Sequence, residues 1–149
     1  MPTLRLLTKS TLAALLLASS AVHALDIRSA VRHGVIMYQA PQDSSKKLFV
    51  LSRNTPLEVL SESDTWLRVR DRDGTLAWMH KADLSSKHFV AAIKPVDVRQ
   101  QADLSSPVVL HADKDVLFEL LDNNRAGWLK VKHRDGATGF VRIEEVWGA

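Results

Sequence analysis

The stretch WLRVRDRDGTLAWM, residues Trp66–Met79, decides how this chain folds, because the chain contains it twice. The second copy, WLKVKHRDGATGFV, occupies Trp128–Val141, 62 positions later (128 minus 66). Tryptophan, leucine, valine, arginine, aspartate and glycine recur in register, and each cation beside the valine remains a cation. A period of about 60 residues is too long for a solenoid and suits one small barrel per copy. The sequence therefore predicts a tandem duplication of a compact β-module.

Short strands between turn signals make up each copy. In the first copy we expect strands at 35–38, 47–52, 57–60, 66–70 and 76–79. In the second copy we expect them at 96–99, 108–112, 116–121, 129–132 and 138–141. Residues 80–84 and 142–146 have the length of one 3₁₀ turn, and 85–88 is the expected junction. The predicted fold class is all-β, with two tandem small β-barrels.

Each copy of the repeated segment reads as a hairpin whose turn contains Asp-Gly, at Asp73-Gly74 and at Asp135-Gly136. Asp hydrogen-bonds its own backbone in such turns, and Gly accepts a positive φ without steric cost. Alternation along the strands then divides the side chains between two faces. The expected inward set is Leu67, Val69, Leu76 and Trp78 in the first copy, and Leu129, Val131 and Phe140 in the second. The expected outward set is Trp66, Arg68, Arg70 and the small Ala77 in the first copy, and Trp128, Lys130, Lys132 and Gly139 in the second.

The first 24 residues have the features of a secretory signal peptide. Arg5 and Lys9 precede an uncharged run, Ser10–Val22, and no acid occurs before Asp26. That run is shorter than the roughly 20 apolar residues that span a bilayer. We expect cleavage after Ala24 and a periplasmic or secreted chain with no membrane anchor.

The charge and the cysteine content of the chain exclude several classes of function. The net charge of +3 falls to about +1 when the two leader cations are removed, so a general nucleic-acid-binding surface is not expected. The chain contains no cysteine, which excludes a disulfide, a catalytic thiolate and a lipid-anchored lipoprotein. Burial of apolar surface must therefore stabilise each small module, and docking of the two modules would help both.

Several segments carry a resemblance to a known family: Pro56–Leu60, Asp64–Asp71, Asp73-Gly74, Trp78–His80 and Leu84-Ser85. Together they resemble the bacterial SH3 (SH3b) domain family, in particular exported proteobacterial proteins with two such domains in tandem. The resemblance implies a signal peptide at 1–24 followed by SH3b domains at 33–87 and 88–149. It also implies a binding role, often toward peptidoglycan or envelope proteins, with no cofactor.

The outward aromatic and basic side chains are the candidate ligand-binding residues. They are Tyr38, Trp66, Arg68, Arg70, Trp128, Lys130 and Lys132. Tryptophan beside cations suits the stacking of a sugar ring and the pairing of a carboxylate, or an extended peptide. The alternative is that the two tryptophans are structural lids on their barrels.

Catalysis is not expected, because no His-x-x-x-His, Gly-x-Ser-x-Gly or phosphate-loop motif occurs. No histidine has a second ligand at metal-binding spacing, so neither a metal nor a cofactor is expected. The resulting hypothesis is a non-catalytic envelope protein that binds peptidoglycan or an envelope peptide. The alternatives are a scaffold that recruits a cell-wall enzyme and, with less support, a cell-wall hydrolase accessory with weak activity.

Overall fold

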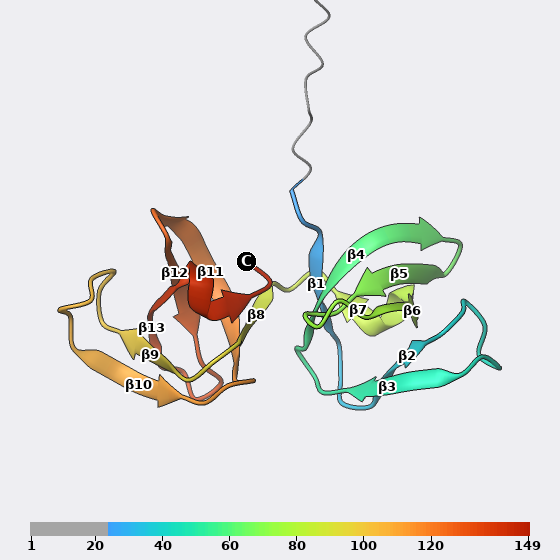
Figure 1. Ribbon diagram of the computed structural model, residues 1–149, viewed down its shortest axis with the longest axis horizontal. Coiled ribbons are helices and arrows are strands. Elements are labelled where there is room, and N and C mark those ends of the chain that lie inside the picture. Colours follow the sequence, from blue (N-terminus) through green and yellow to red (C-terminus); the bar gives the residue numbers. More distant parts are fainter. Residues whose placement is uncertain (1–23) are drawn as a thin grey trace, which may run out of the picture.

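The computed structural model describes residues 24–149, except for the side chains of residues 124 and 125. The predicted signal peptide, apart from Ala24, lies outside the described residues. Two all-β units lie side by side, and the C-terminus lies between them (Figure 1). Within residues 24–149, no helix is long and apolar enough to cross a membrane.

The first unit, called barrel one, is a seven-stranded antiparallel sheet in the order β3-β2-β6-β5-β4-β1-β7. Its strands are β1 (Ile27–Ala30), β2 (Val35–Tyr38), β3 (Lys47–Leu51), β4 (Pro56–Ser63), β5 (Trp66–Arg70), β6 (Leu76–His80) and β7 (Leu84–Ser85). A single 3₁₀ turn, η1 (Lys81–Asp83), connects β6 to β7.

The second unit, called barrel two, repeats this arrangement in the order β10-β9-β13-β12-β11-β8-β14. Its strands are β8 (Phe89–Ala92), β9 (Val96–Arg99), β10 (Val108–Ala112), β11 (Leu117–Arg125), β12 (Trp128–Lys132), β13 (Thr138–Arg142) and β14 (Val146–Trp147). The 3₁₀ turn η2 (Ile143–Glu145) occupies the place of η1. The predicted fold class, all-β with two tandem SH3-like barrels, is confirmed.

The sequence pattern missed β1 and β8, the strands that pair with β4 and β11. In β1, Ser29 interrupts the apolar alternation although it is fully buried. Its hydroxyl shares a hydrogen bond with the Ser85 hydroxyl at 3.0 Å and donates to the carbonyl of Lys87 at 2.8 Å. A buried polar group that is satisfied in this way is compatible with a core strand. Only the tertiary partners reveal it.

The core of barrel one differs from the prediction in which face of β6 turns inward. Leu67 pairs with Met79, and Val69 pairs with Ala77, and all four are buried in one cluster. Leu76 and Trp78 were predicted to face the core. That prediction is wrong, because both lie on the outer face.

Barrel two shows the same register. Leu129 pairs with Val141 and Val131 with Gly139 on the inner side, whereas Phe140 pairs with Lys130 on the outer face. The inward placement predicted for Phe140, and the outward placement of the small residues, are therefore wrong. A Cβ added to Gly139 would lie 2.6 Å from the carbonyl oxygen of Arg99. The small residue faces inward because β9 crosses directly over it.

The hairpin turns are confirmed at both predicted positions. Gly74 has φ +86° and Gly136 has φ +95°. In barrel one, the Asp71 carboxylate accepts hydrogen bonds from the backbone N–H groups of Asp73 and Thr75, at 3.0 and 2.8 Å. In barrel two, the Asp135 carboxylate accepts from the N–H of Ala137 at 2.8 Å, and this hydrogen bond lowers its pKa.

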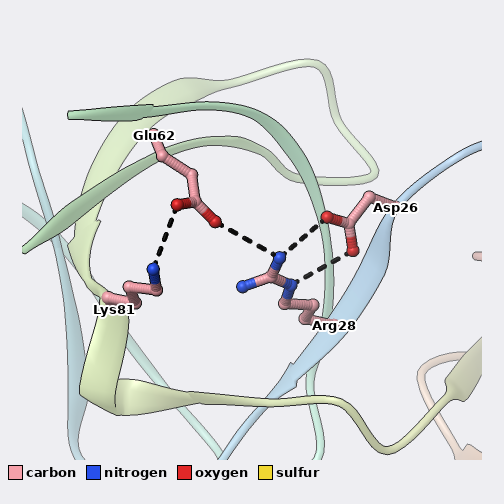
Figure 2. A network of polar contacts seen from close by, with 4 residues as sticks. All are labelled: Asp26, Arg28, Glu62 and Lys81. Carbon is pink, nitrogen blue, oxygen red and sulfur yellow. Dashed lines mark hydrogen bonds and ion pairs between the residues drawn. The ribbon is translucent and has the colours of Figure 1, made fainter. Parts of the chain in front are cut away.

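A network of charged side chains connects β1, β4 and η1 of barrel one (Figure 2). Arg28 on β1 donates two hydrogen bonds to Asp26 and lies 3.5 Å from a carboxylate oxygen of Glu62 on β4. Lys81 of η1 donates to the other oxygen of Glu62 at 3.0 Å, which lowers the pKa of Glu62. These groups are exposed or partly exposed, so the network contributes little to the stability of the fold.

The two barrels contact each other through β8, which packs near β1 and β4. Arg72, in the turn of barrel one, forms an ion pair with Asp115 of barrel two. The C-terminal segment also reaches across, because a Cβ at Gly148 would lie 3.4 Å from the Cβ of Pro56. The connection between β7 and β8 is only Ser86–His88. A connection this short keeps the barrels close together.

We predict that Gly74→Val and Gly136→Val each lower the melting temperature by several degrees. A β-branched residue at positive φ is strained by about 1–3 kcal/mol, which is a large share of the stability of a small domain. Thermal unfolding followed by circular dichroism measures the change. Thr75→Val is the control, since it places a valine beside the turn at a position that does not have positive φ. Wild-type melting of both glycine variants would contradict the turn assignment.

Candidate ligand-binding face

The candidate site of barrel one is the outer face of the β5–β6 hairpin. Directly opposed residues of an antiparallel pair point to the same face. Trp66 opposes His80, Arg68 opposes Trp78, and Arg70 opposes Leu76 on that face. Tyr38 of β2 joins it, because it opposes Trp78 from the other side. We call Tyr38, Trp66, Trp78 and His80 the aromatic face.

Trp66 lies at the centre of a stack rather than at its surface. The His80 ring lies 3.9 Å from the Trp66 ring, centroid to centroid, with 31° between the planes. Tyr38 meets Trp66 edge-on at 5.3 Å. Trp66 is therefore only 9% exposed and Tyr38 only 7%. Both form a rigid floor, and neither presents a free ring face to solvent.

The imidazole of His80 is held in place from a loop. Its Nε2 lies 2.6 Å from a carboxylate oxygen of Asp43, in the segment between β2 and β3. This contact ties the loop to the end of β6. A hollow of about 690 Å³ opens beside His80 and is bordered by Arg32, Asp64 and Lys81. The aromatic face thus ends at a depression lined by charged groups.

Trp78 and Arg68 are the accessible part of this face. Trp78 is partly exposed, and Arg68, directly opposite on β5, is exposed. Within residues 24–149, Arg68 makes no ion pair, so its guanidinium is available to an anion. Arg70 differs, because its guanidinium donates two hydrogen bonds to Glu58, at 2.8 and 2.6 Å. Its positive charge is already compensated.

The corresponding positions in barrel two carry different chemistry. Arg99 stands where barrel one has Tyr38, and Arg142 stands where it has His80. Phe140, 8% exposed, replaces Trp78. Trp128 is half-buried, with the guanidinium carbon of Arg142 lying 5.2 Å from its ring centroid. The two outer faces share their backbone positions but not their side-chain chemistry.

Lys130 and Lys132 are exposed, as predicted for the outer face of barrel two. Lys130 opposes Phe140 and therefore occupies the position of Arg68. Lys132 opposes Glu119 and borders a separate hollow, which residues of barrel one such as His33 and Arg53 also line. The structure thus places Lys132 apart from Trp128.

Sequence reasoning identified the outer face but not all of its members. The structure joins Tyr38 to Trp66 and leaves Arg68 close by. It adds Trp78 and His80, which the pattern had not assigned to this face. The aromatic residue that recurs at positions 78 and 140 was a signal for this face, but the predicted register assigned it to the core. Among the described residues, no group of three or more histidine, aspartate or glutamate side chains could hold a metal ion.

Comparisons with known proteins identify the family of both barrels. Two models of the bacterial SH3 domain match the chain, at residues 33–85 and 92–148. The chain belongs to the bacterial SH3 domain family. Domains of this family are typically cell-wall binding modules.

The chain is also partly similar to two solved structures from Trichomonas vaginalis. NlpC2 is 13% identical with a TM-score of 0.39, over 83% of this chain and 48% of that one. NlpC1 is 18% identical with a TM-score of 0.38, over 92% and 50%. This chain therefore spans about half the length of each. No curated protein sequence matches it significantly.

The corrected register predicts that truncation of two neighbouring residues destabilises barrel one to different degrees. Met79→Ala should destabilise barrel one by about 2–5 kcal/mol, because Met79 is fully buried in the core. Trp78→Ala should cost less, although it removes more atoms, because Trp78 remains partly exposed. Urea unfolding followed by far-ultraviolet circular dichroism compares the two. A larger loss for Trp78→Ala would mean that Trp78 faces the core after all.

Proposed function

We propose that this protein is a non-catalytic binding protein of the bacterial cell envelope. Its ligand is peptidoglycan or an envelope peptide, and barrel one binds it through the aromatic face. The observation that carries the proposal is the pair formed by Trp78 and Arg68. A partly exposed indole and an uncompensated guanidinium lie directly opposite each other on adjacent strands.

The chemistry of this pair suits both parts of a peptidoglycan fragment. An indole offers apolar area on which a sugar ring stacks, and a guanidinium pairs with a carboxylate. Tyr38, Trp66 and His80 lie on the same face as the pair and pack against one another. A prearranged surface loses little conformational entropy when a ligand binds. An extended peptide with an acidic group is the other ligand of the same chemistry.

We predict that the protein co-sediments with purified sacculi and that Arg68→Glu or Trp78→Ala reduces the bound fraction. Arg68→Glu reverses the one charge that the face offers to an anion, and Trp78→Ala removes the stacking surface. The loss caused by Arg68→Glu should shrink as salt increases, since exposed charges are screened beyond about 8 Å at physiological ionic strength. The loss caused by Trp78→Ala should persist in salt.

Lys87→Glu is the matched control, because it makes the same change of charge at an exposed position between the barrels. It should bind as wild type, and all variants should retain the wild-type circular dichroism spectrum. Failure of the wild-type protein to sediment with sacculi, together with retention of a partner protein from extract, would favour the scaffold alternative. Release of soluble fragments from sacculi would contradict the non-catalytic proposal.

The proposed location rests on cleavage after Ala24. The first strand, β1, begins at Ile27, and the carbonyl of Asp26 already accepts a hydrogen bond from the N–H of Val59. Cleavage at this site would leave every strand of barrel one intact. This supports an exported chain that begins at Leu25.

We predict that expression with the leader in a Gram-negative host yields a periplasmic protein whose N-terminal residue is Leu25. Intact-mass spectrometry of the periplasmic fraction tests this directly. Ala24→Tyr is a suitable companion variant, because signal peptidase requires a small residue before the cut, and the precursor should accumulate. A cytoplasmic product that retains residues 1–24 would contradict the proposed location.

A further inference from the structure

The outer face of barrel two has become a cavity where barrel one has a closed stack. The cavity has a volume of about 250 Å³, and its lining includes Arg99, Trp128 and Arg142. In barrel one the corresponding residues are Tyr38, Trp66 and His80, which pack on one another and leave Trp66 nearly buried. In barrel two, Arg99 replaces Tyr38 and Arg142 replaces His80. An open cavity with two cations therefore occupies the place of the closed aromatic stack.

Arg142 is only partly satisfied by the protein. Its Nη2 lies 2.9 Å from a carboxylate oxygen of Glu144, which is exposed. Its Nε is buried and has no hydrogen-bond partner among the described residues. A guanidinium binds a carboxylate best with two adjacent N–H groups, and here one of these donors has no acceptor. The guanidinium carbon lies over the Trp128 ring, 5.2 Å from its centroid.

Arg99 provides the second cation. Its Nη1 donates to the carbonyl of Ser106 at 2.8 Å, which fixes the side chain. Its Nη2 lies 3.9 Å from Asp97, beyond hydrogen-bond distance, and the other oxygen of Asp97 is held by His111 at 2.5 Å. Arg99 lines the cavity, and its Nη2 forms no hydrogen bond with another described residue.

Three acids, Asp97, Asp113 and Glu145, line the cavity together with the two arginines. Asp97 is shared between His111 and Arg99, and Glu145 lies 3.8 Å from Lys94. Asp113, on the rim, makes no ion pair with any described residue. The cavity therefore offers the unpartnered N–H donors of two arginines to a carboxylate, and the unpaired Asp113 to a nearby N–H donor of the ligand.

We propose that barrel two binds a peptide carboxylate in this cavity, between Arg99 and Arg142 and against the face of Trp128. Asp113 accepts from a ligand N–H at the rim. Pockets for drug-sized ligands measure about 300–1,000 Å³, so this smaller cavity holds the end or one side chain of a peptide. The inference goes beyond the proposed function, because it concerns the other barrel and does not require the ligand to come from the cell wall.

Nuclear magnetic resonance of residues 25–149, which contain both barrels, tests the proposal with three probes. They are N-acetyl-alanyl-alanine, its C-terminal amide, and N-acetyl-glutamate amide. The first carries a terminal carboxylate, the third carries a side-chain carboxylate, and the second carries none. We expect one or both carboxylate probes to shift the indole N–H of Trp128 and the Nε–H of Arg142 saturably. The amide should shift neither.

Shifts at Trp128 are followed separately from those at Trp78, which report carboxylate binding to the aromatic face of barrel one in the same sample. Arg142→Lys and Arg99→Tyr should each weaken carboxylate binding about tenfold to a hundredfold, the usual effect of losing a charge-assisted hydrogen bond. Whichever carboxylate probe binds more tightly identifies a peptide C-terminus or an acidic side chain as the source. Equal binding of the amide, absence of saturation with either carboxylate, or shifts at Trp78 without shifts at Trp128 would each overturn the proposal. These readouts use the wild-type chain, so they do not depend on the folding of any variant and are independent of sacculus binding.

Discussion

The pairing of Leu67 with Met79 and of Val69 with Ala77 is the constraint on which the rest of barrel one depends. Side chains on a strand alternate with a period of two, so a shift of one residue would exchange every inner and outer side chain. The turn over residues 71–75 sets this register, because the Asp71 carboxylate holds two backbone N–H groups and Gly74 supplies the positive φ. This turn therefore determines both which side chains form the core and which form the aromatic face.

The small inner residue explains why this register is the stable one. At Gly139, the backbone of β9 passes too close for any side chain larger than a hydrogen atom without a shift. Ala77 holds the same place in barrel one and is almost completely buried. An indole at that position would collide with the crossing strand. Trp78 and Phe140 therefore face outward, where their rings pack against residues of neighbouring strands.

Duplication gave the protein two copies of one scaffold with different outer chemistry. The strand order agrees between the barrels, and the core positions are apolar in both. The outer face has diverged at the positions of Tyr38 and His80, where barrel two has arginines. Inner positions tolerate little change because packed cores transmit any change of volume. Outer positions are free of this limit, so new binding chemistry can arise there without loss of the fold.

The sequence by itself determined the duplication, the two hairpin turns, the all-β class and most strands, because these depend on local alternation and on turn residues. The tertiary structure alone decided which face of β6 turns inward, since that choice follows from the loop length and from the strand that crosses Ala77. The tertiary structure also decided which residues belong to the candidate site. Arg70 was expected there, but Glu58 on the next strand compensates its charge. Trp78 and the cavity beside Trp128 could not be predicted from the pattern, because both depend on residues distant in sequence that meet only when the sheet closes.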